Sequence, residues 1–237
     1  MESNSQLQMR WAGVQSQIAQ RAAARSPAAP AQLIAVSKTR PVAEIAELLQ
    51  AGQRDFGENY VQEATAKITQ LRDADPAPVW HLIGHLQSNK AEHAAQLFDW
   101  IHTVDRSKLL APLSRGRLAR GGEPLNVLIQ VNIDDDDAKH GCAPNDVHAL
   151  AEAILATPGL RWRGLMTIGR HHEQPDDARA TFRQMKALFD SLQTQYPQID
   201  TLSMGMSGDY LQAIDEGATL LRVGSAIFGA RPLKDSP

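Results

Sequence analysis

LIAVSKTRPVAEI, residues 33–45, shows the structural unit from which the rest of the chain is built. An apolar run ends at Lys38, and Pro41 then stands where an amphipathic helix can begin. Side chains alternate along a strand, so the face that carries Ile34 and Val36 also carries Lys38. The pattern predicts a strand followed at once by a helix, with an ammonium group at the end of an otherwise apolar face.

The same unit recurs along the chain. Strands are predicted at residues 33–38, 54–59, 79–84, 100–105, 126–133, 163–168, 201–207 and 219–224. Helical patterns follow near residues 41–52, 60–73, 88–98, 106–120, 143–156, 176–194 and 208–216. Several strands are nearly continuous apolar runs, which is typical of a parallel sheet buried on both faces. Eight such units predict an α/β chain folded as one (β/α)8 TIM barrel, a fold of roughly 250 residues. An open doubly wound sheet is the structural alternative.

A further helix is predicted before the barrel. Leu7, Trp11, Val14 and Ile18 recur at helical spacing, and SPAAP ends the pattern after about residue 25. We therefore expect an N-terminal helix and linker over residues 1–30 and a barrel over residues 31–237.

The composition excludes several classes of protein. The chain has 24 basic and 27 acidic residues among 237, a net charge of −3, which gives no electrostatic reason to expect nucleic acid or an acidic membrane as partner. The single cysteine, Cys142, rules out an internal disulfide framework and fits a reducing compartment. No apolar run reaches transmembrane length and the N-terminus lacks the pattern of a signal peptide, so we expect a cytoplasmic protein.

Polar residues collect at the predicted carboxyl ends of the strands, where TIM barrels carry their sites. The polar residues there are Lys38, Glu58, Asn59, His85, Asp105, Asn132, Thr167, Ser207 and Arg222, and Gly84 lies beside His85. One such residue is weak evidence, because polar groups also mark the point where a strand meets solvent. Their convergence on one rim predicts a binding site there.

Two loops at this rim are suited to a phosphate group. In this fold the loops after strands seven and eight often hold phosphate, and here they read MSGDY and VGSAIFGAR. Ser207 can donate a hydroxyl, and Gly224 with Ser225 can present successive N–H groups. These glycines could equally be ordinary turn residues.

A lysine and a phosphate site together suggest pyridoxal 5′-phosphate (PLP), because a lysine amine forms a Schiff base with an aldehyde. Arg222 would then lie near the pyridine nitrogen and, being always protonated, would keep that nitrogen unprotonated. A PLP held in this way is a weaker electron sink than one that faces an aspartate. The alternative for Lys38 is a lysine at a strand end that extends to solvent.

Six motifs then show a family resemblance. AVSKTRP, FGENYVQE, WHLIGHLQSNK, GLMTI, LSMGMSGDY and LRVGSAIFGAR, spread from Leu33 to Arg231, resemble the pyridoxal phosphate homeostasis protein family. The resemblance implies a monomeric or loosely associated barrel similar to the N-terminal domain of alanine racemase, with PLP as an internal aldimine on Lys38. It also implies that Asn59 lies near the cofactor, that Ser207, Gly224 and Ser225 hold the phosphate, and that Arg222 faces the pyridine nitrogen. IDDDDAKHGC, after strand five, departs from the family pattern and leaves the role of Lys139 open.

The resemblance implies a role in intracellular PLP homeostasis, with release of the cofactor to apo PLP-dependent enzymes. We expect no efficient catalysis, and hence no catalytic residue. Too few residues follow strand eight for the second domain of a racemase, and none of Tyr60, Tyr196 and Tyr210 is an obvious second base. The alternatives are a PLP-dependent amino-acid racemase or lyase and, without any cofactor, a Schiff-base aldolase.

No metal site is expected from the histidines. His81 and His85 span a strand and a turn, so the two do not share a helical face. His171, His172 and Glu173 lack a ligand from another element.

Overall fold

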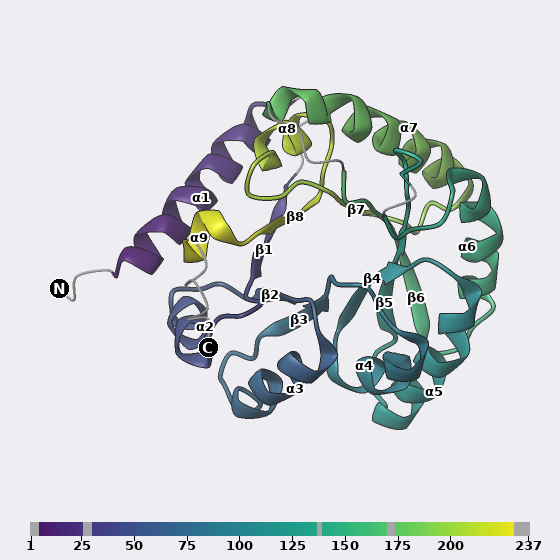
Figure 1. Cartoon of the computed structure of the whole chain (residues 1–237), viewed down its shortest axis with the longest axis horizontal. Coiled ribbons are helices and arrows are strands. Elements are labelled where there is room, and N and C mark those ends of the chain that lie inside the picture. Colours follow the sequence, from purple (N-terminus) through teal and green to yellow (C-terminus); the bar gives the residue numbers. More distant parts are fainter. Residues whose placement is uncertain (1–4, 26–29, 137–138, 170–173, 230–237) are drawn as a thin grey trace, which may run out of the picture.

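Eight parallel strands close into a barrel in the computed structural model, which describes residues 5–25, 30–136, 139–169 and 174–229. Each strand pairs with the next along the chain, and β8 pairs with β1 to close the ring (Figure 1). The strands are β1 (Gln32–Val36), β2 (Asp55–Glu58), β3 (Val79–Leu82), β4 (Trp100–Val104), β5 (Leu125–Gln130), β6 (Leu160–Met166), β7 (Thr201–Ser203) and β8 (Leu220–Val223). The predicted (β/α)8 barrel is confirmed.

Helices surround the ring of strands (Figure 1). They are α1 (Gln6–Ala23), α2 (Val42–Gln50), α3 (Val61–Gln70), α4 (Ala91–Leu97), α5 (Leu110–Arg120), α6 (Val147–Leu155), α7 (Arg179–Gln195), α8 (Tyr210–Asp215) and α9 (Ser225–Phe228). Short 3₁₀ turns lie at Ser88–Lys90, Ser107–Leu109, Pro144–Asp146 and Pro175–Ala178. No helix within the described ranges is long and apolar enough to cross a membrane. His171, His172 and Glu173 lie outside the described residues.

The strands are buried on both faces, as their apolar runs predict. Leu33, Ile34 and Ala35 are consecutive in β1, and all three are buried. Ile34 is paired in register with Arg222 of β8, so the two side chains lie on the same face of the sheet. The other face packs under the helices.

Several strands end earlier than predicted, because the backbone turns before the polar residue is reached. Beyond β1, the N–H of Arg40 donates to the carbonyl of Ser37 at 3.0 Å, and Thr39 has a φ of 63°. Beyond β7, Gly205 has a φ of 91°, a backbone conformation that residues with a side chain rarely adopt. Lys38 and Ser207 therefore sit on loops above the barrel and not within strands.

Helix α1 packs on the outside of the barrel beside α9, near the seam between β1 and β8 (Figure 1). Ser5 caps its first turn by accepting a hydrogen bond from the N–H of Gln8 at 3.1 Å. Trp11 Nε1 donates to Gln53 Oε1 at 2.9 Å, and Arg10 Nε donates to the carbonyl of Ile227 at 2.6 Å. The division of the chain at residue 30 stays a prediction.

Candidate functional site

One cavity of about 610 Å³ opens at the carboxyl ends of β1, β2, β7 and β8. All six residues that the sequence assigned to cofactor binding line it: Lys38, Asn59, Ser207, Arg222, Gly224 and Ser225. Its volume falls within the usual range of small-molecule sites, about 300–1,000 Å³. The structure thus brings these residues to one place, and their roles toward a ligand stay predictions.

The turn that carries Lys38 is held from behind by a second lysine. Lys67 of α3 is only 5% exposed, and its Nζ donates to the carbonyl of Ser37 at 2.7 Å. The same Nζ binds Glu58 Oε1 at 2.8 Å and Glu63 Oε1 at 2.7 Å. Glu63 Oε1 also accepts the N–H of Thr39 at 2.5 Å. Backbone on both sides of Lys38 is therefore fixed by one buried network.

Glu58 is the buried acid of this network. Burial raises its pKa above the ordinary value, while hydrogen bonds from Lys67 and Ser37 oppose the rise. Its Oε2 has no hydrogen-bond partner among the described residues, although the side chain is completely buried. Lys67 is thus the principal partner of a carboxyl that has no access to water.

Asn59 is placed by a close approach between two loops. At Gly84, which follows β3, a Cβ would lie 2.2 Å from the carbonyl oxygen of Asn59. Only glycine fits at that distance, because the obstructing atoms belong to backbone. The loop after β3 therefore supports Asn59 at the cavity wall.

The loops after β7 and β8 meet through a hydroxyl. Ser207 Oγ accepts the N–H of Gly224 at 3.1 Å and the N–H of Ala226 at 3.4 Å. Gly224 also lies close to β1, since a Cβ there would be 3.3 Å from Val36 Cβ. Because Ser207 Oγ accepts both amides, its hydroxyl proton is left to donate, and a hydroxyl donor at the edge of a cavity is suited to an oxyanion.

Arg222 points into the barrel from β8 and is only 4% exposed. Its Nη1 donates to Ser203 Oγ at 2.7 Å, and its Nη2 donates to the carbonyl of Thr167 at 2.8 Å. Burial lowers the pKa of Arg222 to about 10, with Asp209 acting in the opposite direction. The guanidinium therefore stays charged at neutral pH and holds a fixed position at the floor of the cavity.

A chain of hydrogen bonds continues from Arg222 through the barrel interior. Ser203 Oγ lies 3.2 Å from His102 Nδ1, His102 Nε2 lies 3.0 Å from His81 Nδ1, and His81 Nε2 lies 3.0 Å from Asp55 Oδ1. Asp55 lines a second cavity, of about 620 Å³, at the amino ends of the strands. These hydrogen bonds thus connect the two ends of the barrel.

The direction of this chain follows from its ends. Ser203 Oγ accepts from the guanidinium of Arg222 and makes no other hydrogen bond among the described residues than that with His102, so its hydroxyl donates to His102 Nδ1. The carboxylate of Asp55 only accepts, so His81 Nε2 donates to it. This places the proton of His102 on Nε2 and leaves Nδ1 to accept from Ser203. Burial, with the nearby His81 and Arg222, lowers the pKa of His102 well below its ordinary value. A neutral His102 is the form that the chain requires.

Sequence reasoning missed Lys67, His102 and Ser203. Lys67 stands at helical spacing with the buried Val61 and Ala64, so its place on a buried face was available from periodicity. The pairing of Ser203 with His102 joins residues 101 positions apart, and no local pattern indicates such a contact.

None of the tyrosines lines the cavity among the described residues. Tyr60 is 62% exposed. Tyr196 donates its hydroxyl to Glu152, and Tyr210 donates to Gln17. The described wall of the cavity offers no phenol opposite Lys38.

Known proteins match most of this chain. The family model for the N-terminal domain of alanine racemase matches residues 16–232. The pyridoxal phosphate homeostasis protein of Vibrio cholerae is 50% identical over 84% of this chain and 85% of its own length. That of Escherichia coli K12 is 48% identical over 84% and 85%.

Solved structures show the same architecture. PipY of Synechococcus elongatus PCC7942, solved with PLP bound, is 40% identical with a TM-score of 0.83, over 94% of this chain and 100% of PipY. Alanine racemase of Clostridium difficile, at 15% identity and a TM-score of 0.71 over 98% of this chain and 58% of the racemase, shares the fold alone. The shared barrel, the extent of the matches and the arrangement of the cavity agree, and the chain belongs to the pyridoxal phosphate homeostasis protein family.

Proposed function

We propose that this protein binds PLP covalently through Lys38, serves as an intracellular reserve of the cofactor, and releases it to apo PLP-dependent enzymes without efficient turnover of its own. The observation that carries the proposal is the meeting of Lys38, Arg222 and the Ser207–Gly224 contact around one cavity. That PipY, at 40% identity, has been solved with PLP bound supports the choice of ligand. PLP supplies an aldehyde that condenses reversibly with an amine.

The residues present fit each part of this cofactor. Ser207 Oγ accepts the N–H groups of Gly224 and Ala226 within 3.4 Å, and we assign the phosphate to this corner of the cavity, held by the Ser207 hydroxyl with Gly224 and Ser225. Lys38 lines the same cavity, on a turn fixed by Lys67. We assign Asn59 to a position beside the cofactor ring.

Arg222 would face the pyridine nitrogen. Two of its five N–H donors bind Ser203 and Thr167, and the side chain also lines the cavity. A charged guanidinium beside the nitrogen disfavours its protonation, which makes the bound PLP a weaker electron sink. The described wall carries no tyrosine that could act with Lys38 as a second acid or base. The second feature favours a carrier over a racemase.

The test begins with purified protein loaded with PLP. Borohydride reduction followed by peptide mapping should place the cofactor mass on the peptide that contains Lys38. Lys38→Ala should lose the covalent label yet retain PLP, because Ser207, Gly224 and Ser225 remain. A label on Lys90 or Lys139 instead would overturn the assignment, and a colourless protein that still processes an aldehyde substrate would favour an aldolase.

The function is tested by transfer. Loaded protein should restore activity to a PLP-depleted enzyme, with no sustained racemisation or lyase turnover of amino acids. Multiple turnover that disappears in Lys38→Ala would replace the carrier with a racemase or lyase. Three expectations stay predictions: that the protein is a monomer, that it is cytoplasmic, and that the barrel begins at residue 31. Light scattering would measure the oligomeric state.

A further inference from the structure

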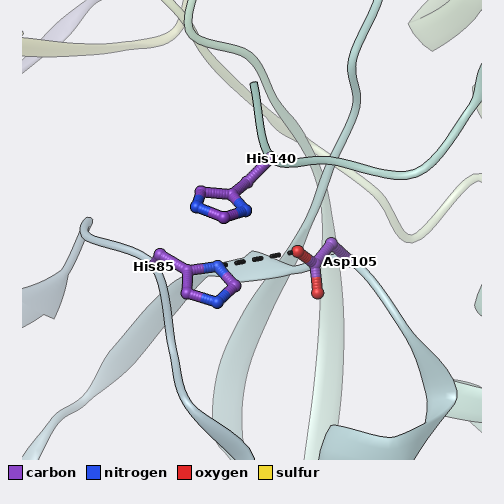
Figure 2. Close-up of side chains that lie close together, drawn as sticks. All are labelled: His85, Asp105 and His140. Carbon is purple, nitrogen blue, oxygen red and sulfur yellow. Dashed lines mark ion pairs between the residues drawn. The ribbon is translucent and has the colours of Figure 1, made fainter. Parts of the chain in front are cut away.

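Two histidines and an aspartate meet on the part of the barrel rim that the cavity does not use. His85 follows β3, Asp105 follows β4, and His140 lies in the loop after β5 (Figure 2). These three residues form the His85 cluster, and none of them lines the 610 Å³ cavity. One ligand atom from each lies within 4.8 Å of the other two. The side chains come from three separate loops and point toward a shared space (Figure 2).

The spacing in the cluster is unsuited to hydrogen bonding. His85 Nδ1 lies 3.8 Å from Asp105 Oδ2, which is too long for a hydrogen bond. Two ligands bound tetrahedrally to zinc, each about 2.0–2.1 Å from the ion, are about 3.3 Å apart. To bind one ion, the His85–Asp105 separation must shrink by about 0.5 Å, and the longest separation in the cluster, up to 4.8 Å, by up to about 1.5 Å.

The two imidazoles stack on each other, with ring centroids 3.7 Å apart and planes inclined by 16°. A metal ion lies in the plane of each ring that binds it, so binding must turn the rings out of this stack. Both histidines are on loops and exposed to solvent, the side chain of His85 by 33%, which leaves room for that rotation. The stack brings two nitrogen ligands together before any ion arrives.

Arg106 orients the carboxylate without occupying all of it. Its Nη1 binds Asp105 Oδ1, while its Nη2 is anchored by the carbonyl of Leu86 at 2.9 Å. This leaves Asp105 Oδ2 directed at His85. Carboxylate ligands are commonly held by such outer hydrogen bonds.

We propose that the His85 cluster is a binding site for a divalent transition-metal ion of the zinc class. One nitrogen from each of His85 and His140 and Oδ2 of Asp105 bind the ion, and water completes the coordination. Two imidazoles and one carboxylate with an open position form a ligand set that such ions accept. Bound there, the ion ties together the loops after β3, β4 and β5.

The test uses untagged, chelator-treated protein and Zn²⁺ alone. Calorimetry and metal analysis after dialysis should give one bound equivalent. His85→Ala and His140→Ala should each weaken binding at least about tenfold, and Asp105→Asn should also weaken it. Co²⁺ should give a visible d–d spectrum in wild type that both histidine variants lose. Borohydride labelling of Lys38 should be unchanged in these variants, which keeps this test independent of the proposed PLP site.

Matched variants separate this site from other ligands in the chain. His93→Ala removes an exposed histidine elsewhere, and Cys142→Ser removes the only thiol in the sequence. A His171→Ala/His172→Ala variant removes two histidines that are neighbours in sequence. All three should bind as wild type does. The proposal is overturned if no equivalent binds, if binding survives His85→Ala and His140→Ala, or if Cys142→Ser or the His171/His172 variant abolishes it.

Discussion

Lys67 Nζ donates to the carbonyl oxygen of Ser37 from 2.7 Å, and Ser37 immediately precedes Lys38. The lysine assigned to the cofactor thus depends on a second lysine for the shape of its turn. The ammonium group of Lys67 is itself held by the carboxylates of Glu58 and Glu63. These two ion pairs both fix the position of Lys67 and balance its charge.

Lys67→Met should destabilise the protein by about 3–5 kcal/mol, because it leaves the completely buried Glu58 without its cation. A Lys67→Met/Glu58→Leu double variant should recover most of that loss, since no buried charge is then left unpaired. Urea unfolding measures both. Lys186→Met is the matched control, because Lys186 pairs with Asp190 at the surface and should contribute at most about 1 kcal/mol. Equal losses in the two single variants would contradict this account of Glu58.

His102 should make stability depend on pH below its ordinary pKa of 6.5. As the pH falls through 6.5 the unfolded imidazole takes up a proton, while the folded one, with its pKa lowered, does not. The free energy of unfolding should therefore fall with falling pH, by up to about 1.4 kcal/mol per pH unit from this one group. His102→Gln keeps an acceptor and a donor but cannot titrate, so urea unfolding between pH 5 and 7.5 should show a shallower slope. Parallel slopes for the two proteins would rule out His102 as the source.

Ser203→Ala should alter the site through Arg222, because it removes the acceptor of the Nη1 hydrogen bond. We expect weaker PLP binding and a shifted visible spectrum, both smaller in size than in Arg222→Ala. Arg222→Glu should shift the cofactor toward the form with a protonated pyridine, since a carboxylate stabilises that charge. Ser114→Ala is the control: its hydroxyl donates to the carbonyl of Pro158, away from the cavity. Wild-type spectra in all of these variants would place Arg222 away from the cofactor.

Ser207→Ala should weaken PLP binding about 10- to 100-fold, the range expected for a lost hydrogen bond to a charged group. Pyridoxal, which lacks the phosphate, should bind this variant as it binds wild type. Equilibrium titrations with both ligands measure the difference. If both ligands lose the same factor, the phosphate lies elsewhere.

The barrel and the gathering of polar residues at one rim could be predicted because both follow from local periodicity. Runs such as residues 33–38 reveal strand and helix directly, and parallel strands bring their carboxyl ends together. The place of Lys38 just beyond the first strand was visible in the same way, although that strand ends at Val36, two residues earlier than predicted. How Lys38 is supported was not, because its turn depends on Lys67, which lies in another element.

The chain of hydrogen bonds from Arg222 to Asp55 could not be predicted from the sequence for a different reason. His81 and His102 look like isolated polar residues in apolar strands, and their relation exists only when β3 and β4 lie side by side. The His85 cluster has the same character. His85 and Asp105 stood among the rim residues, but the approach of His140 depends on the path of the loop after β5.

The pairing of β1 with β8 also determines when the cavity can exist during synthesis. Ile34 is in register with Arg222, so the strand before Lys38 meets the strand before Gly224 only when the ring closes. Lys38 leaves the ribosome some 180 residues before the loop that contributes Gly224 and Ser225. A growing or truncated chain without β8 therefore has the amine but lacks Arg222 and Gly224, and it cannot assemble this cavity. Capture of a small molecule there would report that translation has passed β8 and that the barrel has closed.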